Sequence, residues 1–153
     1  MDLDNPPENP CFGCGPQHAR GLRLAFRREG DEVVTTHAPK PDEVGWPGLF
    51  HTGLHFTLLY EASYWAALEL TGKVMTSFGP ATFDQERLPR VGAVTTARGR
   101  VVARDPFTVE ARTTSPEGKT QGTLRTTWRA ASRARTERAG IALPRYLLDS
   151  MEP

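Results

Sequence analysis

The chain has 153 residues, of which 38% are hydrophobic, 24% charged and 8% aromatic. This balance is typical of a globular domain and excludes a disordered or collagen-like chain. A domain of this length buries enough surface to fold without a disulfide or a structural metal. No apolar run approaches the roughly 20 residues that a membrane-spanning helix needs. The first ten residues are acidic and proline-rich, unlike a signal peptide, so we expect a cytoplasmic protein.

The net charge of +1 argues against a dedicated nucleic-acid-binding protein. Residues 1–97 carry 8 basic and 12 acidic side chains, a net of −4, whereas residues 98–153 carry 11 and 6, a net of +5. The basic part either forms solvated strand faces and a tail or offers a surface to an anionic ligand such as a phosphate.

Both cysteines lie in one short motif, Cys11-Phe-Gly-Cys14. The glycines and the proline around it predict a turn rather than the start of a helix. Three interpretations stay open. The motif is a structural turn, a redox pair, or part of a zinc site, which needs distant or second-subunit ligands because only His18 is close in sequence.

The first part of the chain predicts an arm and a hairpin. Residues 1–20 read as an irregular arm. Alternating apolar and polar residues predict a strand at 21–28, and a β-branched run predicts its partner at 32–37. The segment 39–47 holds three prolines and predicts a loop.

The longest predicted helix runs from Leu54 to Leu70 and ends at Gly72. At about 100° per residue its apolar side chains point in almost every direction, which indicates a helix buried on all sides. Glu61 interrupts this apolar surface. A buried carboxylate needs a partner or a raised pKa, so we expect either an ion pair with a strand arginine or a tuned acid or base.

After the helix the apolar period returns to two, which predicts antiparallel strands near 74–87, 93–104, 107–115 and 120–130. Residues 132–153 read as an arginine-rich tail with a short helix at Arg145–Met151. A hairpin, one buried helix and four strands together predict an α+β domain. Its sheet curls around the helix, and a second subunit closes the open side.

Three stretches resemble motifs of the hotdog-fold thioesterase superfamily. They are Cys11-Phe-Gly-Cys-Gly-Pro16 with the following Gly21-Leu-Arg-Leu-Ala-Phe26, then Gly45-Trp-Pro-Gly-Leu-Phe-His-Thr-Gly53, and Leu88-Pro-Arg-Val-Gly92. The first is similar to the N-terminal signature of one branch. The second resembles the P-G-x-x-H-G-G start of the central helix, and the third resembles a turn between long strands. The resemblance spans about residues 10–130.

The resemblance implies an N-terminal arm at 1–20, a hotdog domain at 21–131 with its central helix at about 53–70, and a tail at 132–153. It implies a homodimer or a dimer of dimers that hydrolyses acyl thioesters of coenzyme A or acyl carrier protein. The active site is then expected at the dimer interface, beside the start of the helix. No metal or cofactor is implied, since coenzyme A enters only as part of the substrate, and neither nucleic acid nor membrane is an expected partner.

In this motif His51 takes the position at which the helix starts, and Thr52 and Gly53 take the two glycine positions. Exposed N–H groups at a helix start stabilise negative charge, so the Thr52 N–H is the expected donor to the thioester oxygen. The superfamily's carboxylate usually lies nine residues after the histidine, where this chain has Tyr60. Either the neighbouring Glu61 serves as base, or Tyr60 acts as a hydrogen-bond donor or weak acid, or hydrolysis is lost and the protein only binds its ligand.

Further residues are weaker candidates. Ser77 and Thr82 are the candidates for a hydroxyl that assists from the other subunit. The candidates for binding the phosphates of coenzyme A are Arg87, Arg90, Arg98 and Arg100. A hydratase on the same fold fits less well, because it typically needs an Asp/His pair at the mouth of the helix. The acidic residue nearest His51 in the sequence is Glu43, in a loop.

Overall fold

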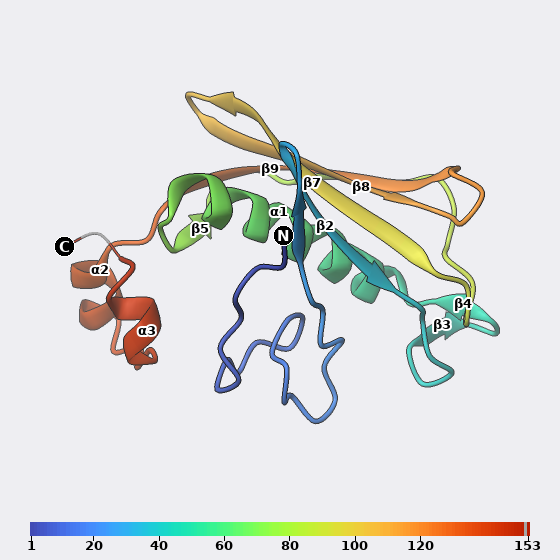
Figure 1. Ribbon diagram of the computed structural model, residues 1–153, viewed down its shortest axis with the longest axis horizontal. Helices are drawn as coiled ribbons and strands as arrows, with labels where there is room; N and C mark the ends of the chain where they lie inside the picture. The colour runs from blue at the N-terminus through green and yellow to red at the C-terminus, as the bar shows by residue number, and fades with distance from the viewer. Residues whose placement is uncertain (152) are drawn as a thin grey trace.

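The computed structural model describes residues 1–151 and 153. Its elements follow the predicted order of hairpin, long helix and antiparallel strands (Figure 1). The helices are α1 (Thr52–Thr71), α2 (Arg133–Arg138) and α3 (Arg145–Leu148). The strands are β1 (Arg27–Glu29), β2 (Glu32–His37), β3 (Val44–Trp46), β4 (Leu49–Phe50), β5 (Met75–Ser77), β6 (Thr82–Gln85), β7 (Thr95–Arg104), β8 (Phe107–Thr114) and β9 (Thr120–Ala130).

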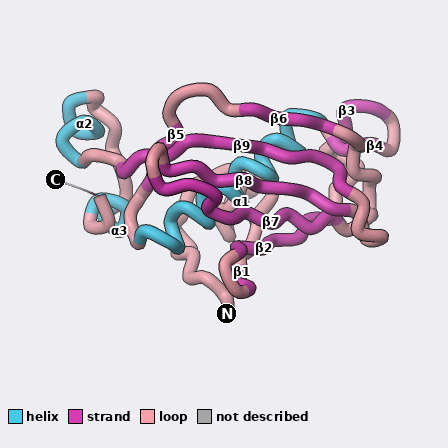
Figure 2. Tube along the Cα trace, turned by 90° about the horizontal axis from the view of Figure 1, so that it is seen from above, coloured by secondary structure: helices cyan, strands magenta, loops and turns pink. Residues whose placement is uncertain are grey.

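Seven strands form one antiparallel sheet in the order β1-β2-β7-β8-β9-β5, and β6 also pairs with β9. β5 pairs with the end of β9 and β6 with its middle, so both extend the same edge of the sheet. Figure 2 shows the strands crossing over α1, with the separate β3–β4 hairpin at one end and α2 and α3 at the other. This arrangement confirms the predicted α+β fold.

The sheet packs closely on one side of α1 because small residues face each other there. A Cβ at Gly99 of β7 would collide with the main-chain carbonyl of Ala62. Leu58, Leu59 and Ala62 of the helix are fully buried against this surface. At this distance only glycine fits at position 99 of the strand, opposite an alanine of the helix, and the close contact fixes how α1 packs on the sheet.

The N-terminal arm covers the side of α1 that faces away from the sheet (Figure 1). The Phe26 ring stacks on Trp65 of the helix with centroids 4.9 Å apart. Leu22 and Leu24 are buried in the same core. The chain therefore closes part of this open side itself, where the sequence led us to expect a second subunit.

The predicted strand at 21–28 is wrong for most of its length, since only Arg27–Glu29 forms β1. The N–H groups of Leu22 and Leu24 donate instead to the arm carbonyls of Phe12 and Gly13, both at 3.0 Å. Arg23 between them has a φ of 53°, which a strand does not accommodate.

Three other segments differ from prediction. The strand expected at 74–87 is split into β5 and β6 at Gly79, whose φ is 75°. The loop expected at 39–47 contains β3, and the tail holds α2 besides the expected C-terminal helix, which ends at Leu148. α1 ends as predicted, with Gly72 at a φ of 64°. Within the described residues, no helix has the length and apolar character needed to cross a membrane.

Candidate functional site

The start of α1 is held open to solvent by the residues before it. His51 caps the helix, because its Nδ1 accepts the Gly53 N–H at 3.0 Å. The His51 N–H donates to the main-chain carbonyl of Glu43 at 2.8 Å, which ties the cap to the β3–β4 hairpin. Thr52 is the first helical residue and is exposed, and its N–H has no acceptor within the helix. The helix start thus presents an N–H group and the positive end of the helix dipole.

Glu43, whose main-chain carbonyl holds the cap, has its side chain fixed by other contacts. Its carboxylate is buried and hydrogen-bonded to Nε2 of His37 at 2.6 Å, and it also accepts the Lys40 N–H at 3.0 Å. The carboxylate is therefore engaged away from the helix mouth, and only the main-chain carbonyl of Glu43 contacts His51. This arrangement gives no support to the hydratase interpretation.

Tyr60 is half-buried on a wall of aromatic rings. Its ring centroid lies 5.1 Å from that of Trp128 and 6.0 Å from that of Phe56. Its hydroxyl is hydrogen-bonded to Ser77 Oγ at 2.9 Å. Ser77, expected to assist from the other subunit, thus contacts Tyr60 within its own chain.

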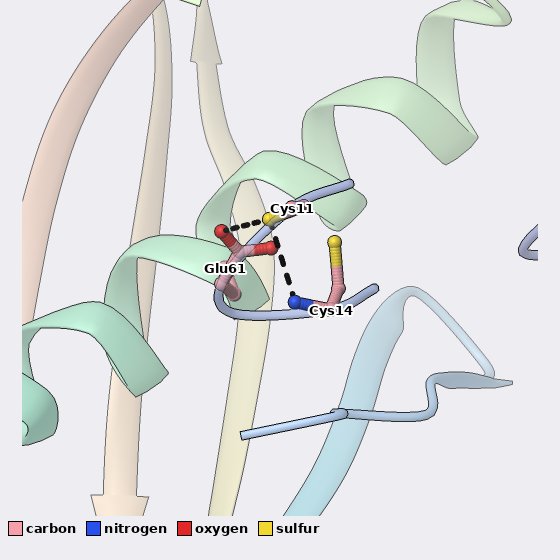
Figure 3. Close-up of side chains that lie close together, drawn as sticks. All are labelled: Cys11, Cys14 and Glu61. Carbon is pink, nitrogen blue, oxygen red and sulfur yellow. Dashed lines mark hydrogen bonds between the residues drawn. The ribbon is translucent and has the colours of Figure 1, made fainter. Parts of the chain in front are cut away.

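Glu61 is 8% exposed and contacts the arm rather than a strand arginine. Its Oε1 is hydrogen-bonded to Cys11 Sγ at 3.3 Å (Figure 3). Its Oε2 is buried and has no hydrogen-bond partner among the described residues. A Cβ at Gly13 would collide with the Glu61 side chain, so the turn between the cysteines lies directly on the carboxylate. Of the two alternatives for Glu61, the ion pair with a strand arginine is therefore wrong, because the cysteine turn lies on the carboxylate where an arginine would be needed.

The three ionisable groups of this cluster perturb one another. Burial raises the pKa of Glu61 to about 8, and the neighbouring Cys11 thiolate adds to the effect. The hydrogen bond from the Cys14 side chain lowers the pKa of Cys11 to about 5. The same hydrogen bond, together with burial, raises the pKa of Cys14 above its ordinary value. Of the three groups, only the Cys11 thiol has a lowered pKa, and the Cys14 side chain is the largest cause.

A cavity of about 270 Å³ joins this cluster to the aromatic wall. Its lining residues are Asn9, Cys11, Cys14, Tyr60, Glu61, Tyr64, Met75, Thr76 and Leu147. Tyr60 and Glu61 therefore border one space. Thr52 does not, because nine residues of helix separate it from Glu61 by about 13 Å along the axis.

Most of the candidate arginines are already paired. Arg98 contacts Glu29 and Glu32 at 2.8 and 3.2 Å, and Arg100 lies 3.8 Å from Glu110. Arg87 contacts Glu86 at 3.5 Å. Arg90 is exposed and forms an isolated bridge with Leu49 of β4, two residues before the helix cap. Arg90 is therefore the candidate that lies beside the helix start.

The contact between the cysteine turn and Glu61 was missing from the sequence-based prediction. It joins residues 50 positions apart, so no local period or spacing reveals it. Two features of the sequence could have suggested this contact: the carboxylate of Glu61 on an otherwise apolar helix, and Gly13 between the two cysteines.

No family model matches the sequence, and no curated protein matches it either. Solved structures match its fold. The thioesterase superfamily protein RHA08564 superposes with a TM-score of 0.70 at 18% identity, covering 78% of this chain and 62% of that one. The E. coli PaaI protein from the phenylacetic acid degradation operon has a TM-score of 0.63 at 18% identity, covering 72% and 80%.

A hypothetical thioesterase from Streptococcus pneumoniae TIGR4, solved with coenzyme A, has a TM-score of 0.62 at 18% identity, covering 69% of this chain and 86% of that one. The chain thus spans about three fifths of the length of RHA08564 and most of the other two. At these identities the likeness establishes the fold alone. The long helix α1 packed against an antiparallel sheet is the hotdog fold of thioesterase-superfamily structures.

Proposed function

We propose that this protein hydrolyses the thioester bond of an acyl-CoA or an acyl carrier protein beside the start of α1. The observation that carries the proposal is the exposed Thr52 N–H at a helix start whose next N–H is already capped by His51. Two structures of the same fold contain coenzyme A or acetyl-CoA, which supports the class of ligand.

In this proposal the thioester oxygen accepts a hydrogen bond from the Thr52 N–H. When water attacks the carbonyl carbon, the negative charge that develops on this oxygen is stabilised by the N–H and the helix dipole. Glu61 takes the proton of the attacking water, directly or through a water held between Tyr60 and Glu61. It returns this proton to the sulfur as the carbon–sulfur bond breaks, so the carboxylic acid and the free thiol are released. The exposed Arg90, bridged to Leu49 beside the helix start, is our candidate for binding the phosphates of coenzyme A.

A second copy of the chain is needed to complete this site. Thr52 and Glu61 are separated along one helix, so the donor of one protomer has to meet the base of its partner. The β3–β4 hairpin beside the helix start supports an interface there, because Trp46 is 70% exposed and Val44 39%. We therefore propose a homodimer or a dimer of dimers.

One observation favours a protein that binds acyl-CoA without hydrolysing it. Tyr60 stands where the superfamily's carboxylate is expected, and its hydroxyl is engaged with Ser77. The nearest carboxylate, Glu61, is turned into the cysteine cluster. This arrangement predicts affinity for acyl-CoA without turnover.

The test is release of free thiol from short, long and aryl acyl-CoAs by the wild type and by Thr52→Pro. Proline is accepted at the first helical position and removes the N–H, and the ψ of 130° at His51 already suits a following proline. Loss of one such donor lowers kcat by about 10²- to 10³-fold. Thr52→Ala, which keeps the N–H, is the matched control and should retain turnover.

Glu61→Gln and Tyr60→Phe then test the base. If both retain wild-type turnover, the assigned roles are wrong. If no acyl-CoA is turned over but binding is measurable, the protein is a binding module. If no acyl-CoA binds either, both functions are contradicted.

A further inference from the structure

The two cysteines and Glu61 bring three metal-binding atoms together from distant parts of the chain. Both Sγ atoms and a carboxylate oxygen lie within 4.8 Å of one another. In Figure 3 the turn of the N-terminal arm places both cysteines beside Glu61 on α1. In a tetrahedral zinc site, ligand distances of 2.0 to 2.3 Å place neighbouring ligand atoms about 3.5 to 3.8 Å apart. The cluster is therefore within a small side-chain adjustment of that geometry.

The turn around the cysteines already directs donors at both sulfur atoms. The Cys14 N–H donates to Cys11 Sγ at 3.4 Å, and Asn9 Nδ2 donates to Cys14 Sγ at 3.4 Å. The Gly15 N–H closes the turn on the Cys11 carbonyl at 2.8 Å. Hydrogen bonds to sulfur stabilise thiolates, and such outer contacts orient the ligands of metal sites.

The described residues around the cluster's cavity also carry no positive charge. No lysine or arginine is among the residues that line its cavity. Glu61 Oε2 is buried and has no hydrogen-bond partner among the residues that the structure describes. A buried carboxylate oxygen without a partner is costly, and a bound cation would satisfy it.

We propose that Cys11, Cys14 and Glu61 bind one zinc ion. Two thiolates and a carboxylate suit a borderline-soft divalent metal, and two intervening residues is the usual spacing of a zinc-binding cysteine pair. Three protein ligands leave the fourth position to a water that faces the cavity beside Tyr60. The resemblance to hotdog thioesterases implied no metal, so the site goes beyond the proposed function.

The zinc site and the proposed hydrolysis are tested separately. Zinc binding is read from metal content and spectra, without any thioester. Because a bound ion would occupy the carboxylate that we propose as base, the turnover assays above are run on zinc-free protein as well as on zinc-loaded protein.

The experiment uses the full chain, reduced, stripped of metal with a chelator and titrated with Zn²⁺ alone. We expect about one ion per chain. Cys11→Ser and Glu61→Gln should each weaken the affinity at least tenfold, since even the loss of an outer contact weakens a metal site by about 10- to 100-fold. Glu69→Gln is the matched control. Glu69 lies on the same helix, is paired with Arg28 at 3.2 Å and should leave binding unchanged.

Cobalt provides a readout of the ligands themselves. Co²⁺ bound to the wild type and to Glu69→Gln should show a thiolate-to-metal charge-transfer band that Cys11→Ser weakens. Circular dichroism confirms that each variant is folded, and Glu61→Gln keeps the test valid if a cysteine variant is not.

Reduced, folded wild-type protein that takes up no zinc would overturn the proposal. Binding that is unchanged in Glu61→Gln would also overturn it, because the ion would then lie elsewhere. A Cys11–Cys14 disulfide that re-forms after reduction, in protein that binds no zinc, would make the motif a redox pair instead.

Discussion

The two sides of helix α1 are built in opposite ways. On the sheet side, the main chain of Ala62 meets Gly99, and His55 Nε2 is hydrogen-bonded to Thr113 Oγ1 of β8. On the arm side, Glu61 lies under the Cys11–Cys14 turn with one carboxylate oxygen unpaired among the described residues. The contrast teaches that the fold depends on close backbone packing on one side. The groups with reactive chemistry gather on the other side, where an irregular arm covers the helix.

The largest expected effect on the sheet side is a loss of stability at acidic pH, caused by His55. His55 is fully buried, its Nε2 lies 2.7 Å from Thr113 Oγ1, and burial lowers its pKa to about 4 from an ordinary 6.5. Between pH 6.5 and 4, His55 is protonated in the unfolded chain but stays neutral in the folded chain. The resulting stability is therefore complete above pH 6.5 and lost as the pH falls towards 4. The loss amounts to about 3 kcal/mol.

The measurement is the free energy of unfolding in urea between pH 7 and pH 4, for the wild type and for His55→Gln. Other groups titrate equally in both proteins, so the difference between the two curves isolates His55. We expect the variant to have the shallower dependence. Parallel curves would show that His55 is protonated in the folded protein as readily as in the unfolded chain. Water would then reach the sheet side more easily than its packing indicates.

A matched pair of glycine substitutions compares the two sides directly. Gly99→Ala places a Cβ against the main chain of Ala62, which cannot move without shifting the helix on the sheet. We expect a loss of about 2 kcal/mol or more in the free energy of unfolding. The measurement is chemical denaturation with an unchanged m-value.

Gly13→Ala is the counterpart on the arm side. Its Cβ meets the side chain of Glu61 rather than a backbone, and a side chain can change its rotamer. We expect a loss of about 1 kcal/mol, accompanied by weaker zinc binding because the carboxylate is displaced from the cysteines. If the two variants lose the same free energy of unfolding, the arm packs on α1 as rigidly as the sheet does.

The same contrast explains what the sequence could predict. The helix at 54–70 and the long strands at 93–104, 107–115 and 120–130 were predicted to within a few residues, since periodicity and Gly72 report local structure and burial. The strand at 21–28 failed because its N–H groups are used by the arm carbonyls, a contact that alternation does not encode.

For the candidate site, the sequence identified Glu61 as a buried carboxylate with either an arginine partner or a raised pKa, and the structure has the raised pKa and no arginine partner among the described residues. The partner of Glu61 depends on which distant segment covers that face of α1. The cysteine turn can cover it because Gly13 has no side chain to collide with the carboxylate. The roles of Thr52 and Glu61 stay predictions. The structure places them on separate parts of one helix, so the proposed mechanism brings them together through a second subunit.

The smallest effect concerns the boundary between the two sides, where Tyr60 borders the cavity beside Glu61. Tyr60→Phe removes its exposed hydrogen bond to Ser77, and Ser77→Ala removes the same bond while it keeps the phenol. Each should cost less than about 1 kcal/mol of stability, and the double variant should lose little more than either alone, because they share one interaction. If Tyr60 orients the attacking water, Tyr60→Phe lowers kcat, whereas Ser77→Ala leaves the hydroxyl free and changes kcat less. Equal turnover in both variants would place Tyr60 among the packing residues of the aromatic wall and leave the chemistry to Glu61.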